Sequence, residues 1–175
     1  GSNTIATPNF TNMQTLANLI THISLNMPEL SYVDEEYGQL EALQQPDTDT
    51  YPLTFPAVLI NTEGVEWSSI SDGAQTGVGT VRVRLLIDCY DDTHAGSGTT
   101  NKAADRQAVV HRLHTILEGH RPNEEGALTR TSSKSMVGFR GIKIYDQFYT
   151  YSAKEFTQMK ETAPIRTITL KTSRI

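Results

Sequence analysis

Cysteine is almost absent from this sequence, which has one, at position 89, among its 175 residues. A single cysteine excludes an intrachain disulfide and any metal site built from several thiolates. Basic residues are also scarce, because 15 Lys and Arg stand against 20 Asp and Glu and leave a formal net charge of −5. This acidic balance weighs against a protein that grips nucleic acid through bulk positive charge.

Long apolar segments are missing too. No run of the sequence approaches the roughly 20 residues that span a bilayer, and the first 30 residues carry no basic-then-apolar leader. We therefore expect a protein of a reducing cytoplasm. The length and the 37% hydrophobic fraction predict one domain with a real core, not two full domains.

Two segments have the spacing of an amphipathic helix. In the first, apolar residues recur at near-helical intervals over residues 13–25, with Thr11 or Asn12 placed to cap the helix and Pro28 to stop it. The polar residues 1–11 are expected to form a flexible lead-in. The second helix is expected from about Lys102 to Gly119, where the glycine supplies the C-cap.

Strand patterns surround the second helix. The clearest covers residues 78–90, where apolar residues alternate with Arg82 and Arg84. Further strands are expected at 30–37, 55–60, 128–140 and 142–152, with a last strand or extended arm at 164–172. Residues 61–77 have little pattern and are expected to form a loop or a loose hairpin, and residues 44–52 a turn-rich loop.

This order predicts an α+β protein. We expect a single mixed or antiparallel β-sheet with two main helices packed on one face, plus flexible loops. The domain is expected to cover residues 12–152, and residues 153–175 to form a C-terminal strand or arm.

Residues that could carry chemistry are few. His111 and His114 lie three apart and share a helix face, so a small metal-dependent enzyme that uses them is one alternative. The sequence places no third ligand, and the segment Gly96–Lys102 lacks the glycine–lysine step of a phosphate loop. Cys89 falls on the core side of its strand. We therefore expect no catalytic residue, no metal and no cofactor.

Aromatic and arginine side chains on the strands are candidates for a subunit interface. Trp67, Tyr149 and Tyr151 are either interface anchors or ordinary core residues. Arg82 and Arg84 suit a pair with carboxylates of another subunit, and the alternative is a solvated sheet face.

The succession of segments resembles a known family. A first amphipathic helix leads to the strand FPAVLI and, after a glycine-bearing loop, to VGTVRVRLLIDCYD. A polar loop, the helix ADRQAVVHRLHTILEG and a hairpin that ends in YDQFYTY complete the unit. Over about residues 12–152 this resembles the bacteriophage tail-terminator or tail-completion proteins, the type that includes the lambda minor tail protein U.

The resemblance implies a structural protein and not an enzyme. Terminators of this type form a ring, commonly a hexamer, that caps the tail tube, stops its polymerisation and meets the head connector. The implied partners are copies of the chain itself, tail-tube proteins and head-connector proteins, while DNA passes through without being specifically bound. The implied location is the virion tail, and the host cytoplasm during assembly. Another head–tail neck or completion protein is the nearest alternative.

Overall fold

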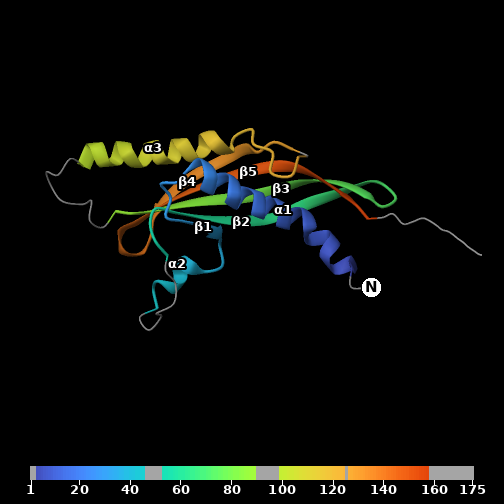
Figure 1. Cartoon of the computed structure of the whole chain (residues 1–175), viewed down its shortest axis with the longest axis horizontal. Helices are drawn as coiled ribbons and strands as arrows, with labels where there is room; N and C mark the ends of the chain where they lie inside the picture. Colours follow the sequence, from blue (N-terminus) through green and yellow to red (C-terminus); the bar gives the residue numbers. More distant parts are fainter. Residues whose placement is uncertain (1–2, 46–52, 90–98, 125, 158–175) are drawn as a thin grey trace, which may run out of the picture.

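The computed structural model describes residues 3–45, 53–89, 99–124 and 126–157, and the side chains of residues 3–12 and 99–101 lie outside that description. Five strands form one mixed sheet in the order β1-β2-β3-β5-β4 (Figure 1). The elements in chain order are α1 (Asn3–Asn26), β1 (Tyr32–Glu35), α2 (Gln39–Ala42), β2 (Ala57–Ser71), β3 (Ala74–Asp88), α3 (Thr99–Leu117), β4 (Thr129–Val137), a 3-10 turn (Phe139–Gly141) and β5 (Ile142–Phe156). This architecture confirms the α+β class predicted from the sequence.

Helices α1 and α3 pack on the same face of the sheet, as expected (Figure 1). Helix α1 presents Leu19 and Ile23, one helical turn apart, to this face, and α3 presents Leu113 and Leu117. Alternate residues of three strands of the sheet pack against these helix residues. They are Val58 and Ile60 of β2, Val81, Val83 and Leu85 of β3, and Tyr145, Tyr149 and Tyr151 of β5. Each such buried side chain stabilises the fold by about 2 kcal/mol, so this layer holds the two helices in place.

The hairpin of β2 and β3 is longer than the sequence pattern predicts. Residues 61–77, expected to form a loop or loose hairpin, continue both strands on either side of the turn at Gly73, where φ is 75°. A bulge between Thr62 and Gly64 absorbs one residue of β2. The polar segment is extended because β3 pairs along its whole length with β5 on its other side and so offers β2 a fixed template.

The ends of the domain differ from the prediction. Helix α1 begins at Asn3, so residues 3–11 of the expected lead-in are helical backbone and neither Thr11 nor Asn12 is the cap. Extending a helix that is already packed completes one backbone hydrogen bond per added residue without a new nucleation step, and that outweighs the polar composition. At the other end β5 continues to Phe156, beyond the expected boundary at residue 152, while the strand predicted at 164–172 lies outside the described residues.

The opposite face of the sheet, which we call the open face, is covered only in part. Helix α2 and the segment before β2 place Leu40 and Leu53 over a second, smaller apolar cluster with Leu59, Leu86 and Ile144. Past this cluster, toward the tip of the β2–β3 hairpin, no described helix lies over the open face. No helix in the described part of the chain has both the length and the apolar character needed to cross a bilayer.

Candidate functional site: charges, buried tyrosines and open edges

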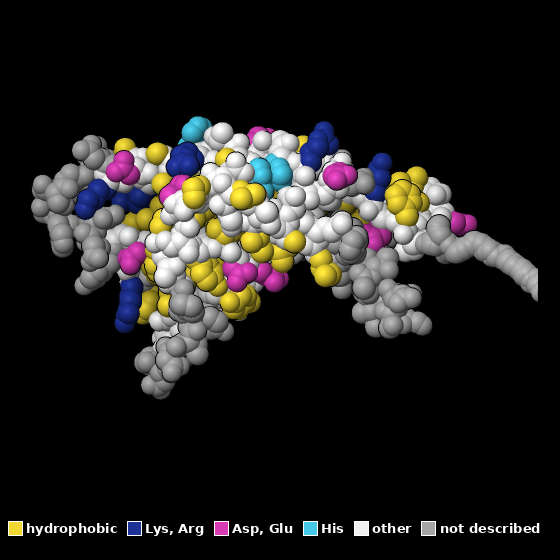
Figure 2. Space-filling view, viewed as in Figure 1, with side chains coloured by type: hydrophobic (Ala, Val, Ile, Leu, Met, Phe, Trp, Pro, Cys, Tyr) yellow, Lys and Arg dark blue, Asp and Glu magenta, His cyan; other side chains and the backbone are white. Residues whose placement is uncertain are grey.

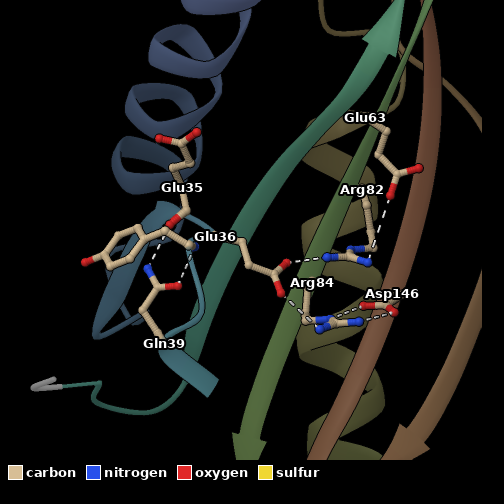
Figure 3. Close-up of polar contacts among 8 residues, drawn as sticks. Glu35, Glu36, Gln39, Glu63, Arg82, Arg84 and Asp146 are labelled. Atoms are coloured by element: carbon tan, nitrogen blue, oxygen red, sulfur yellow. Dashed lines mark hydrogen bonds and ion pairs between the residues drawn. The ribbon is translucent and has the colours of Figure 1, made fainter. Parts of the chain in front are cut away.

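Arg82 and Arg84 lie two residues apart on β3 and point to the open face (Figure 3). The Arg84 guanidinium donates to both carboxylate oxygens of Asp146 on β5, from Nε at 2.8 Å and from Nη2 at 3.0 Å. It also donates from Nη1 to Glu36 at 3.1 Å. Arg82 pairs with the other oxygen of Glu36 and lies 3.9 Å from a carboxylate oxygen of Glu63. Two arginines and three carboxylates thus form one network.

The network is a support for the fold. Asp146 is 1% exposed, and its hydrogen bonds to Arg84 raise the pKa of that guanidinium. Glu36 follows β1, and its backbone N–H donates to Ile60 of β2, so its carboxylate ties the β1–α2 connection to the centre of the sheet. The carboxylates that pair with Arg82 and Arg84 therefore belong to the same chain. This corrects the hypothesis that the two arginines pair with carboxylates of another subunit.

Tyr149 and Tyr151 belong to the core. They are 0% and 3% exposed, beneath the helices, so they are not surface anchors and the core alternative is correct for both. Burial raises the pKa of each phenol. The tyrosines share a strand face, as expected, but that face points inward because the helices cover it.

Trp67 differs from the tyrosines. It lies on the outer half of β2, partly buried against the main core, with Gly77 of β3 directly opposite. A Cβ atom at position 77 would lie 2.8 Å from the indole, so a glycine there leaves room for the ring. Among the five candidate interface residues, Trp67 is the aromatic one that retains exposed surface.

The two histidines of the metal alternative are not brought to a common site. His111 is exposed, whereas the ring of His114 turns to the sheet with Nδ1 2.9 Å from the Tyr149 hydroxyl. Burial, and then the nearby charge of Arg130, lowers the pKa of His114. The described residues contain no group of three or more His, Cys, Asp or Glu placed to hold a metal ion. Cys89 is buried.

Sequence reasoning missed a second histidine pair. The rings of His22 on α1 and His120 after α3 stack with centroids 3.6 Å apart. Each ring also reaches the other helical segment, since His22 Nε2 donates to the carbonyl of Ile116 at 2.7 Å and His120 Nε2 donates to Asn18 at 2.6 Å. Nothing in the local pattern joins positions so far apart in the chain.

Exposed hydrophobic side chains gather at the two ends of the sheet. One group consists of Ile70, Val78 and Phe156, which belong to the outer half of the β2–β3 hairpin and to the end of β5 that pairs with it. Hydrophobic side chains are visible at the right-hand end of the molecule in Figure 2. The other group lies at the β4–β5 turn and consists of Met136, Val137 and Phe139. Beside this turn a groove of about 560 Å³ is lined by Leu43, Phe55, Asp88, Phe139, Arg140 and Ile142.

Both edges of the sheet have open stretches. Every residue of β4 is exposed, and no other described strand pairs with its outer side. Strand β1 covers the edge of β2 only at Ala57–Ile60, so the outer side of Asn61–Ser71 has no strand beside it in the described part of the chain. An unpaired edge offers backbone N–H and C=O groups to another chain.

No protein-family model matches the chain, and a search of curated proteins found no match either.

Proposed function

We propose that this chain is a structural subunit of a phage or prophage tail or neck, and specifically a tail terminator. In this role copies of the chain assemble into a ring that caps the tail tube and joins it to the head connector. It acts by assembly and not by catalysis, in the virion tail and, during assembly, in the host cytoplasm. The resemblance over residues 12–152 is the starting point of the proposal.

The observation that carries the proposal is the pair of apolar ends on the sheet. Six of the nine large hydrophobic side chains exposed in the described residues fall in these two groups. Val137 at one end is 70% exposed and Phe156 at the other is 66% exposed. Apolar surface gathered in this way marks contact sites between proteins, and a ring subunit needs two different surfaces that meet head to tail.

The charge of the chain agrees with this role. A net charge of −5 gives little attraction for the phosphate backbone, so DNA can move through a channel lined by such subunits without being held. Another head–tail completion protein would share these properties. Removal of the gene distinguishes a terminator from another completion protein. Loss of a terminator leaves tube growth unstopped and gives overlong tails, whereas loss of another neck protein gives tails of normal length.

The direct test is the size and shape of the purified full chain. Native mass spectrometry over a concentration series, with negative-stain electron microscopy of the same sample, is expected to show a closed ring. Val137→Ser and Phe156→Ser should each weaken the ring without unfolding the subunit, as monitored by circular dichroism. A monomer at every concentration, together with unaltered tails after gene removal, contradicts the proposal.

A further inference from the structure

The open edges of β4 and β2 differ in charge. Strand β4 carries Arg130 and Lys134 and no acidic residue. The outer half of β2 carries Glu63 and Glu66 and no basic residue. Lys134 faces the open face, because it lies directly opposite Asp146. Glu66 also faces that side, since Val65 and Trp67 on either side of it pack against the helix-covered core.

The backbone groups of β4 have a defined direction. The N–H of Gly138 donates to the carbonyl of Ile142 at 2.6 Å, so these two residues form a hydrogen-bonded pair at the end of the β4–β5 ladder. Because such pairs alternate along an antiparallel ladder, the N–H and C=O groups of Ser133 and Ser135 point away from β5. The N–H of Arg130 also points outward, and the carboxylate of Glu118, the residue after α3, accepts it at 3.0 Å, so the start of this edge is closed.

The same reasoning applies to β2. The carbonyl of Ile60 points outward, where it accepts from the backbone of Glu36. The bulge shifts the alternation by one residue, so that Gly64 and Glu66 turn their backbone groups toward β3. Val65 and Trp67 then direct theirs outward, and β2 and β4 each have two consecutive outward positions available for pairing.

We infer that β4 of one copy adds to the outer edge of β2 in the next copy, as an antiparallel pair with Lys134 opposite Glu66. The inference rests on the assembly proposed above and names one contact between its copies. Successive strands from β2 through β3 and β5 to β4 are antiparallel, so β4 runs opposite to β2. Two copies held in the same orientation therefore meet as antiparallel strands, the natural continuation of this sheet.

Charge selects this pairing over a symmetric one. Two β4 edges paired about a two-fold axis bring Lys134 near its own copy or near Arg130 of the other copy, and like charges across a ladder destabilise it. In the β4–β2 pair the basic strand meets the acidic one. The interface is then heterologous, and such an interface forms rings when its rotation closes.

The offset of this pairing suits closure. Within one chain Lys134 is level with Leu59 of β2, through Asp146 and Arg84. When Lys134 of one copy lies opposite Glu66 of the next, it is seven residues further along β2 than Leu59. The bulge absorbs one of these seven residues, so the shift between copies is about 20 Å at about 3.3 Å per residue. Over four strand spacings of about 4.8 Å each, this shift tilts the strands by about 45° from the axis of closure, near the tilt of closed sheets.

The first test removes an outward backbone donor. Ser135→Pro deletes the outward N–H at the centre of β4 without touching the bonds to β5, and Ser135→Ala is its matched control because it keeps that N–H. We expect the proline variant to weaken association of the full chain by roughly tenfold, since one backbone hydrogen bond is lost and its acceptor on Val65 is left unpaired in the interface, and the alanine variant to assemble like wild type. Circular dichroism verifies that both variants fold.

The second test exchanges the charges. Lys134→Glu and Glu66→Lys should each weaken assembly alone, whereas an equimolar mixture of the two chains, or the double variant, should restore it. In the mixture, opposite charges meet only between different chains. Recovery of assembly there therefore cannot come from a change in the stability of the monomer. Native mass spectrometry reads both mass and composition, and the restored rings should contain the two chains in equal numbers.

The outcomes separate this interface from the function itself. If wild type assembles and all these variants assemble equally well, the β4–β2 interface is wrong and the terminator proposal stands. If Ser135→Pro weakens assembly but Glu66→Lys does not, β4 binds another occupant, such as β4 of a second copy or the segment 164–172, and the inference is overturned. A wild-type chain that stays monomeric at every concentration overturns the β4–β2 interface, and it overturns the terminator proposal as well when gene removal also leaves the tails unaltered.

Discussion

His22 and His120 stack face to face between α1 and the segment after α3, with their ring planes within 9° of parallel. Asn26 Nδ2 lies 3.3 Å from Nδ1 of His22, while Nε2 of the same ring lies 2.7 Å from the carbonyl oxygen of Ile116. The stack joins α1 to the end of α3, so the protonation of His120 bears on how the helices that cover the sheet are held together.

Acid is expected to weaken the fold through His120. Burial, and then the neighbouring His22, holds the pKa of His120 below its ordinary value. His120 is therefore protonated at a lower pH in the folded protein than in the unfolded chain. The contribution to stability is therefore full above the ordinary histidine pKa of about 6.5, and it falls as the pH drops through that value toward the lower pKa of the folded state.

Urea unfolding at a series of pH values from 8 to 5 measures this effect. The His120→Gln variant keeps a hydrogen-bonding side chain but cannot titrate, so its free energy of unfolding should decline less than that of wild type over the interval below about pH 6.5. Parallel pH curves for the two proteins would show that His120 has no such role. The His111→Gln variant, at an exposed position on α3, is the matched control and should follow wild type.

A methyl group at Gly79 is expected to disrupt the core. A side chain there would come within 2.4 Å of the ring of Tyr151, which is buried and cannot swing away. Gly79→Ala should therefore lower the free energy of unfolding by about 2 kcal/mol, the usual cost of overpacking. Gln75→Ala, at an exposed position on the same strand, should change it by less than about 0.5 kcal/mol. Equal stabilities of the two variants would show that the ring yields.

Loss of Asp146 is expected to leave Arg84 short of a counter-charge. The Arg84 side chain is 12% exposed, so in Asp146→Ala it stays largely buried and keeps its ion pair with Glu36 alone, and the free energy of unfolding should fall by about 3 kcal/mol. Glu63→Gln removes a longer pair whose carboxylate is 34% exposed and should cost less than about 1 kcal/mol. Chemical denaturation of both variants measures the difference, and similar losses would contradict the ranking.

The strongest local patterns predicted the helix-covered core. The alternation in β3 identified Val81, Val83 and Leu85 as one buried face, and the apolar stripes located both helices. These predictions succeed because hydrophobic burial on one face imposes a period that the sequence must follow. The same argument does not say which face of β5 lies inward, since both faces carry apolar residues, and Tyr149 and Tyr151 stayed ambiguous until the helices were placed.

Features that depend on distant partners could not be predicted. Arg82 and Arg84 were rightly placed on a common strand face, but the carboxylates that bind Arg84 lie 48 and 62 positions away in the sequence. The outer half of β2 has a polar composition, and only its pairing with β3 makes it a strand. In both cases the fold brings together groups that no local pattern links.

The order in which the chain is synthesised conflicts with the order in which its core is built. Helix α1 leaves the ribosome early, yet Leu19 and Ile23 pack in a cluster that includes Tyr149 and Tyr151 from β5, the last described strand. The surface that its apolar stripe packs against is incomplete until that strand has been made. The stripe therefore stays exposed to solvent or bound to a chaperone during synthesis. Folding of this domain is therefore expected to begin late in translation, with the N-terminal helix docking onto a sheet finished by the C-terminal half.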